Sequence, residues 1–104
     1  MQDTVFIIPG FWGIPSEKIY KDISKLYSEH GIKPIVVNIP WKRKVMSDYS
    51  SYFMYFYNAH KNGKTHLFGW SFGAMIAYIA ASQIEVETMV LCSTSPYWKE
   101  QLVK

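Results

Sequence analysis

The sequence predicts an α/β protein, a three-layer sandwich in which helices cover both faces of a short parallel sheet. Short apolar runs typical of strands alternate with longer runs in which apolar residues recur every three or four positions, as on one face of a helix. The first short run, at residues 4–8, is continuous and almost wholly apolar, which is typical of a strand that is covered on both faces. With 104 residues, the chain is expected to form a single domain, residues 1–104.

Four strands are expected, at residues 4–8, 35–39, 65–68 and 88–92. The first reads Thr-Val-Phe-Ile-Ile and stops at Pro9-Gly10, a pair that ends strands and begins loops. Strand–helix–strand alternation of this kind requires crossover connections, which are right-handed and give a parallel sheet.

Three helices are expected between these strands. Ser16 is predicted to cap the first helix, because serine oxygens accept hydrogen bonds from the free N–H groups of a first turn. The face of this helix that is expected to be buried carries Ile19, Ile23, Leu26 and His30. Ser47 or Asp48 is predicted to cap the second helix, and the third is expected to run from residue 72 to about residue 83.

The most informative stretch lies between the third strand and the third helix, where Gly69, Ser71 and Gly73 form a Gly-x-Ser-x-Gly pattern. A serine on a sharp strand-to-helix turn has an exposed hydroxyl, and the tight backbone leaves no room for a Cβ two residues away on either side. The helix that follows directs its free N–H groups towards negative charge that develops beside the serine. The alternative is an ordinary turn serine, although such turns seldom require both glycines.

This strand–turn–helix arrangement resembles the α/β-hydrolase family, in its amino-terminal half and over nearly the whole chain. The resemblance implies the strand order 2-1-3-4 and a site where the loops at 9–13 and 69–73 meet. It also implies a serine esterase that hydrolyses an ester or thioester through an acyl-enzyme on Ser71. By position, the backbone N–H groups of Phe11 and Phe72 would form the oxyanion hole, with Trp12 as the next candidate if the register differs by one.

Two further features of the loop after the first strand bear on the resemblance. Gly10 is expected to be a structural turn residue there, as Gly69 and Gly73 are at the serine. Pro9 stands where the family has the histidine of its His-Gly dipeptide, a change that is tolerable because the loop contributes backbone.

The family places its catalytic acid and then its histidine after the serine, whereas His30, His60 and His66 all precede Ser71 here. Three explanations are open. The chain is the amino-terminal fragment of a longer hydrolase, which is the explanation favoured by the intact first half, or it takes its base from another chain. Alternatively, it is a catalytically inactive domain that acts as a binding or scaffold module.

The aromatic residues, the net charge and the spacing of possible metal ligands indicate which kinds of binding partner to expect. Trp12 and Trp70 flank the proposed site and are candidates for binding an apolar acyl substrate, with ordinary core packing as an equal alternative. The net charge of +3 is spread along the chain and does not indicate nucleic acid binding. No His, Cys, Asp or Glu cluster has the spacing of metal ligands, so neither a metal nor another cofactor is expected.

The sequence has no run long enough for a membrane helix and no leader pattern, and it has one cysteine, Cys92, so a cytoplasmic location is expected. A sheet that ends at Cys92 would expose an apolar edge, which predicts self-association.

Overall fold

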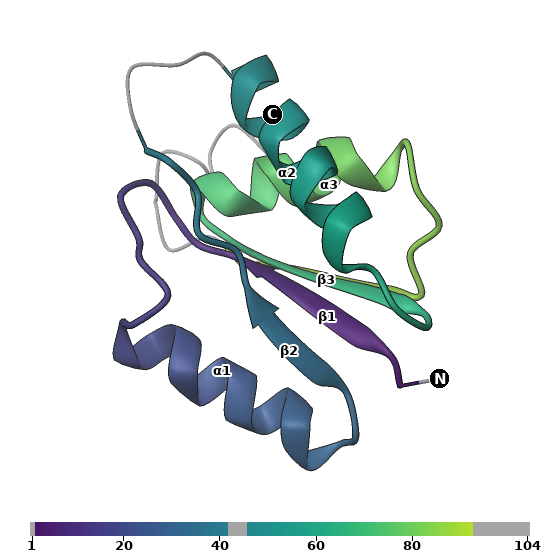
Figure 1. Ribbon diagram of the computed structural model, residues 1–104. Coiled ribbons are helices and arrows are strands. Elements are labelled where there is room, and N and C mark those ends of the chain that lie inside the picture. Colours follow the sequence, from purple (N-terminus) through teal and green to yellow (C-terminus); the bar gives the residue numbers. More distant parts are fainter. Residues whose placement is uncertain (1, 42–45, 93–104) are drawn as a thin grey trace.

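A computed structural model of the chain describes residues 2–41 and 46–92 (Figure 1). It has one parallel sheet with the strand order β2-β1-β3-β4, which confirms the predicted order. The strands are β1 (Thr4–Ile8), β2 (Lys33–Val36), β3 (Thr65–Trp70) and β4 (Thr88–Cys92). The helices are α1 (Lys18–Glu29), α2 (Met46–His60) and α3 (Phe72–Ala81).

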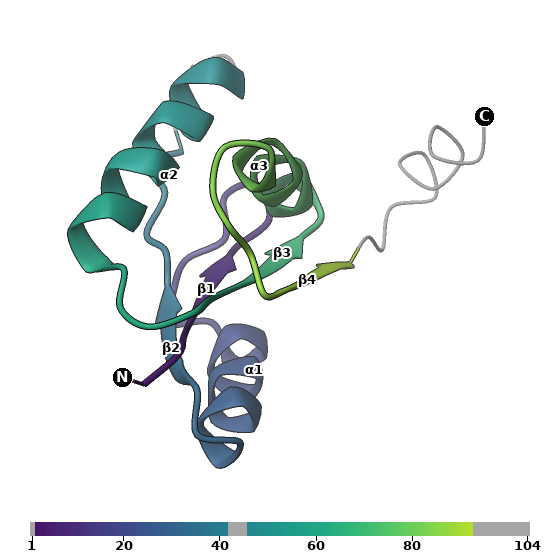
Figure 2. The ribbon, with the colours of Figure 1, turned by 90° about the vertical axis from the view of Figure 1, so that its right-hand side faces the viewer.

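The elements form three layers, as the sequence predicted. In Figure 2, α1 covers one face of the sheet, and α2 and α3 lie side by side over the other face. The carboxyl ends of all the strands therefore meet at one edge, which lies to the left in Figure 1.

β1, one of the two inner strands, is buried along its whole length, and its side chains alternate between the two faces. Phe6 and Ile8 face the larger core under α2 and α3, together with Leu67 of β3. Val5 and Ile7 face the smaller core, which α1 covers. The continuous apolar run at residues 4–8 thus reflects a strand with a core on each side.

Several boundaries differ from the expected ones. β2 ends at Val36 instead of residue 39, although the Val37 N–H still donates to the Ile7 carbonyl oxygen at 2.9 Å. β3 continues beyond residue 68 to Trp70, because residues 69 and 70 pair with Leu91 and Cys92 of β4. α3 ends at Ala81, two residues before the expected end.

The predicted helix caps are wrong. α1 begins at Lys18, with Glu17 at the cap position, so Ser16 lies one residue outside. The Glu17 carboxylate accepts a hydrogen bond from the Ile14 N–H at 2.9 Å and thereby closes the preceding turn. α2 begins at Met46, which places Ser47 and Asp48 in its first turn instead of at its cap.

The buried face of α1 is also shifted from the predicted one. Tyr20 is 3% exposed, and Ile23 and Tyr27 pack beside it, whereas Ile19 and Leu26 are 40% and 57% exposed. A stripe of Tyr20, Ile23 and Tyr27 fits the helical period as well as the predicted stripe does. The two tyrosines place their rings in the core.

β2 and β4 are the two outermost strands of the sheet among the described residues. β4 is the more exposed of the two. The central side chains of β4, those of Met89, Val90 and Leu91, are 37–42% exposed. None of the described helices has the length and apolar character needed to cross a membrane.

We expect Phe6→Ala to destabilise the fold by about 3–5 kcal/mol, because it empties a fully buried site that Phe53, Phe56 and Tyr57 surround. Urea unfolding followed by circular dichroism measures this loss. Tyr55→Ala is the control: this ring is 78% exposed, and its removal should cost less than about 0.5 kcal/mol. Equal losses in the two variants would contradict the described core.

Candidate functional site

Ser71 occupies a sharp turn between β3 and α3. Its backbone has φ 55° and ψ −116°, and α3 begins at the next residue. The Ser71 N–H donates to the Cys92 carbonyl oxygen at 2.6 Å, and its carbonyl oxygen accepts from the Ala74 N–H at 2.9 Å. A positive φ is uncommon for a residue with a side chain, and it persists only where the surroundings enforce it. Here β4 and the first turn of α3 both bind the Ser71 backbone.

The two glycines around Ser71 lie where a side chain has no room. A Cβ at Gly69 would lie 2.6 Å from the Ala74 Cα, inside the first turn of α3. A Cβ at Gly73 would collide with the backbone carbonyl oxygens of Ile8 and Pro9, at the end of β1. The glycines therefore allow α3 to begin in direct contact with the sheet.

The loop after β1 lies against the same turn. A Cβ at Gly10 would lie 3.3 Å from the Ser71 Cβ and 3.2 Å from the Trp70 carbonyl oxygen. Residues 10–13 form a turn in which the Gly13 N–H donates to the Gly10 carbonyl oxygen at 2.8 Å. Trp12, the third residue of this turn, has φ 65°, a second positive value on a residue with a side chain. The structure thus brings together the two loops that the sequence placed at the site.

Backbone N–H groups beside Ser71 are available as hydrogen-bond donors. Within the described part of the chain, no protein acceptor is recorded for the N–H groups of Phe11, Trp12 or Phe72. Phe72 is the first residue of α3, where a helix leaves its N–H groups free. A negatively charged oxygen beside Ser71 could therefore be bound without breaking an existing hydrogen bond.

Aromatic rings surround the loop. The Phe11 ring centroid lies 5.0 Å from that of Trp12, 5.2 Å from that of Trp41 and 5.4 Å from that of Phe72. Phe11 is 47% exposed and Trp12 is 62% exposed, so both rings reach the surface. Trp70 instead packs against the core under α1, beside Cys92. Of the two tryptophans predicted to bind substrate, only Trp12 presents most of its surface to solvent.

Sequence reasoning missed two side chains that hold this loop. The Gly10 N–H donates to the Tyr20 hydroxyl oxygen at 2.9 Å, and the Trp41 Nε1–H donates to the Gly13 carbonyl oxygen at 2.8 Å. Burial raises the pKa of the Tyr20 hydroxyl above its ordinary value, so this group is neutral at physiological pH. The spacing of Tyr20, Ile23 and Tyr27 places them on one helix face, and this pattern in the sequence could have indicated that Tyr20 is buried.

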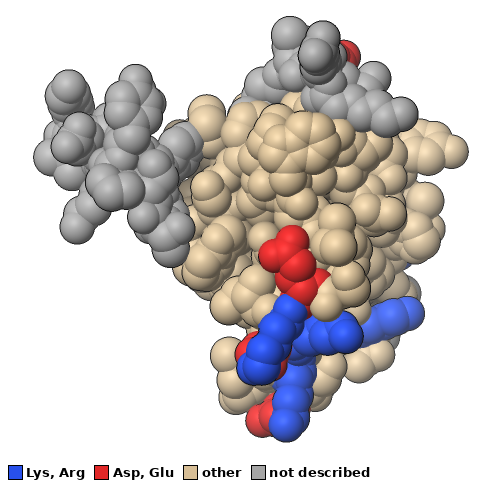
Figure 3. Space-filling model, turned by 90° about the vertical axis from the view of Figure 1, so that its left-hand side faces the viewer, with Lys and Arg blue, Asp and Glu red and all other residues tan. Residues whose placement is uncertain are grey.

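Figure 3 looks onto the edge where the strands end. The charged side chains on this side gather mainly in its lower part, over α1, and most of the remaining described surface is uncharged. α1 carries Lys18, Lys21 and Lys25 as exposed residues, and Lys18 Nζ pairs with the Asp22 carboxylate at 2.8 Å. The described surface near Phe11 and Trp12 therefore suits an apolar group better than a charged one.

The three histidines lie at the opposite edge of the sheet, away from Ser71. His30 follows the last turn of α1, and His60 ends α2, close to the point where the Thr4 hydroxyl donates to the Asn62 carbonyl oxygen at 2.8 Å. His66 lies near the start of β3, five residues before Ser71. At about 3.3 Å per residue, this separation is roughly 16 Å. Among the described residues, no histidine is within hydrogen-bonding reach of Ser71.

His66 has a structural role instead. Its Nε2 lies 3.0 Å from the Asp3 carboxylate, its Nδ1 lies 2.6 Å from the Thr88 hydroxyl, and the residue is 6% exposed. These contacts tie the start of β1 to β3 and β4. The hydrogen bond with His66 is the main cause that holds the pKa of the Asp3 carboxyl below its ordinary value.

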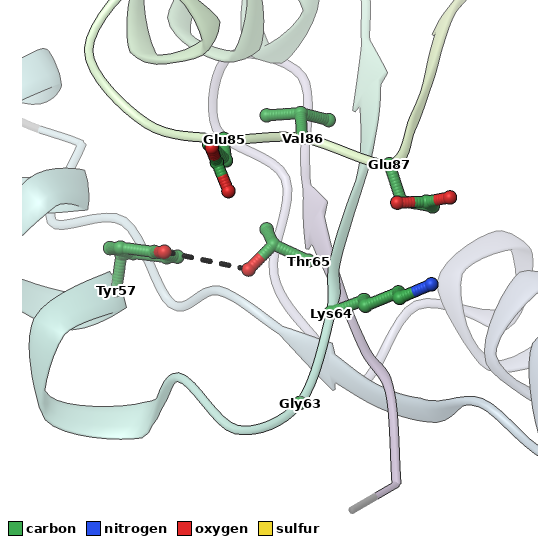
Figure 4. A pocket seen from close by; sticks show the side chains of 7 residues that line it. All are labelled: Tyr57, Gly63, Lys64, Thr65, Glu85, Val86 and Glu87. Carbon is green, nitrogen blue, oxygen red and sulfur yellow. Dashed lines mark hydrogen bonds between the residues drawn. The ribbon is translucent and has the colours of Figure 1, made fainter.

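A cavity of about 390 Å³ also lies at this opposite edge (Figure 4). It is lined by Tyr57, Gly63, Lys64, Thr65, Glu85, Val86 and Glu87. The Tyr57 and Thr65 hydroxyl oxygens are 3.5 Å apart across it. None of the predicted site residues lines this cavity.

The described residues contain no group of three or more His, Cys, Asp or Glu side chains placed to hold a metal ion.

No family model matches the sequence, and neither does any curated protein. Among solved structures, the chain is similar to alpha/beta hydrolase domain-containing protein 10 from mouse, with 13% identity and a TM-score of 0.73. It is also similar to the ydeN gene product of B. subtilis, with 17% identity and a TM-score of 0.67. Each match covers 86% of this chain, but 39% and 50% of the other chains. The likeness shows an α/β-hydrolase-like fold, and this chain spans half or less of the length of these two proteins.

We expect the Asp3–His66 contact to make stability depend on acid pH. Because the folded pKa of Asp3 is depressed, its contribution is fully present above pH 3.8 and is lost as the pH falls through the folded pKa. Urea unfolding between about pH 5 and about pH 2 should show a smaller decrease for Asp3→Asn than for wild type. Glu29→Gln, a change of an exposed carboxylate on α1, should retain the wild-type decrease. Parallel curves for Asp3→Asn and wild type would contradict this role.

The positive φ of Trp12 predicts an inverted order of stability for its smallest replacements. Trp12→Gly and Trp12→Ala remove the same ring, but alanine retains a Cβ that disfavours the left-handed backbone by about 1 kcal/mol. Trp12→Gly should therefore be the more stable variant by that amount in urea unfolding. If Trp12→Ala is as stable as Trp12→Gly or more so, the backbone at this position is not left-handed.

Proposed function

We propose that this chain supplies the nucleophile and the oxyanion-binding half of a serine hydrolase site, which acts on an ester or thioester through an acyl-enzyme on Ser71. One observation carries the proposal: Ser71 is held at positive φ between β3 and α3, and the N–H groups of Phe11 and Phe72 beside it have no acceptor among the described residues. A serine in this position has an accessible hydroxyl and backbone donors beside it.

The chemistry follows from these groups. The Ser71 Oγ attacks the carbonyl carbon of the substrate and passes its proton to a general base, while the carbonyl oxygen becomes negatively charged. The N–H groups of Phe11 and Phe72 donate to that oxygen, each lowering the barrier by about 3 kcal/mol. The tetrahedral intermediate expels the alcohol or thiol, which takes the proton from the base, and water then hydrolyses the acyl-enzyme by the same steps.

The general base is not among the histidines of this chain, because all three lie at the opposite edge of the sheet from Ser71. We propose that the base and its carboxylate come from a further polypeptide segment. The structural matches support this, since this chain corresponds to 39% and 50% of the two proteins.

The surface beside Ser71 favours an apolar acyl group. Phe11 and Trp12 expose aromatic rings there, and the charged side chains of this side gather mainly over α1 (Figure 3). Trp12 is the better candidate for substrate contact, because Trp70 packs into the core.

A cytoplasmic location and self-association through β4 stay predictions.

The alternative is a binding module without turnover. The absence of a histidine beside Ser71 in the described residues favours this alternative. It requires the site to bind an apolar ligand with Ser71 chemically inert. Reactivity of the Ser71 hydroxyl distinguishes the two functions.

We expect a fluorophosphonate to label the folded chain once, at Ser71, as measured by intact mass. Added imidazole should accelerate labelling, because it can replace the missing base. Ser71→Ala should lower the labelling rate at least about 100-fold. Ser82→Ala, which removes an exposed hydroxyl at the other end of α3, should leave the rate unchanged.

A folded wild-type chain that gains no adduct, even with imidazole present, would overturn the proposed hydrolase and support the binding module. Labelling that persists in Ser71→Ala would show that the reactive residue lies elsewhere.

A further inference from the structure

The turn at residues 10–13 is bound at both ends by side chains from separate elements. At its start, the Gly10 N–H donates to the Tyr20 hydroxyl of α1 at 2.9 Å. At its end, the Gly13 carbonyl oxygen accepts from the Trp41 indole N–H, which follows β2, at 2.8 Å. Both hydrogen bonds are buried, and the two side chains are only 3% and 6% exposed. Solvent therefore competes with neither bond.

These bonds determine the direction of the Phe11 N–H. The Gly10 carbonyl and the Phe11 N–H belong to one planar peptide group, in which they point in opposite directions. The Gly13 N–H binds that carbonyl oxygen at 2.8 Å, so the Phe11 N–H must point away from the turn. The Tyr20 bond fixes the peptide before this group, and the Trp41 bond holds Gly13, which supplies the binding N–H.

Neither side chain can follow the loop if the loop moves. Tyr20 packs in the core under α1 with Val5 and Ile7 of β1. Trp41 packs against Tyr49 of α2, with ring centroids 5.2 Å apart. A Cβ at Gly13 would lie 2.8 Å from the Tyr20 hydroxyl oxygen, so the turn has no spare space on that side. The two layers of helices thus hold the loop from opposite faces of the sheet.

We propose that Tyr20 and Trp41 are positioning residues that hold the Phe11 N–H in place to bind the oxyanion formed at Ser71. This inference rests on the proposed function of Ser71 as the nucleophile. Both side chains are nearly buried, so neither is placed to contact a substrate at the surface. Their role is to orient one donor before the reaction begins, so that the loop does not reorganise as charge develops.

The test measures fluorophosphonate inactivation of the full chain with imidazole present, and it separates the maximal rate constant from the reagent concentration at half-maximal rate. Tyr20→Phe removes the hydroxyl that binds the Gly10 N–H, and Trp41→Phe removes the indole N–H that binds Gly13. Each variant should lower the maximal rate constant about tenfold with an unchanged half-saturating concentration, because the donor acts mainly as negative charge develops.

Tyr27→Phe is the matched control. Tyr27 lies on the same helix and in the same core, and the structure records no bond from its hydroxyl to the described loop at 10–13. Its rate constant should equal that of wild type. Urea unfolding of each variant separates a local effect from general destabilisation.

The outcomes distinguish the positioning role of Tyr20 and Trp41 from the proposed role of Ser71 as the nucleophile. If wild type is labelled at Ser71 and Tyr20→Phe reacts within twofold of it, the positioning role is overturned while the nucleophile stands. It is likewise overturned if Tyr27→Phe slows the reaction as much as Tyr20→Phe does. If wild type is not labelled at Ser71, the proposed function fails, and the positioning role fails with it.

Discussion

The contact between the start of α3 and the end of β1 constrains the rest of the site. Gly73 lies against the carbonyl oxygens of Ile8 and Pro9, and any side chain there would push the helix off the sheet. Because α3 begins this close, the Ser71 backbone adopts a positive φ, and the Phe72 N–H beside it has no acceptor among the described residues. The same closeness brings the loop at 10–13 against Ser71.

The two ends of the parallel strands carry groups with different roles. The edge where the strands end carries Ser71, backbone N–H groups that have no acceptor in the described part of the chain, and exposed aromatic rings. The edge where they begin carries Asp3, His66 and Thr88, whose hydrogen bonds join three strands. A histidine that is nearly buried and bound on both nitrogens serves the fold, so its presence in the chain does not complete a catalytic site.

The sequence alone predicted the strand order, the layers and the meeting of the loops around Ser71, because these follow from apolar periodicity and from the resemblance of one local pattern. It did not predict the role of Tyr20. Ile19 and Leu26 are more apolar, so the buried face of the first helix was assigned to them and not to the face that carries Tyr20. The bonds from Tyr20 and Trp41 join residues 10 and 28 positions apart, so no local pattern marks them. Nor does a tryptophan indicate a left-handed backbone, which glycine or asparagine usually occupies.

A crystal structure of the chain with Ser71 phosphonylated tests the central claim most directly, because the phosphonyl oxygen occupies the position of the oxyanion. The account predicts that this oxygen lies about 2.7–3.1 Å from the backbone nitrogens of both Phe11 and Phe72. A phosphonyl oxygen that points to solvent, or that is bound by the Trp12 nitrogen in place of Phe11, would contradict it.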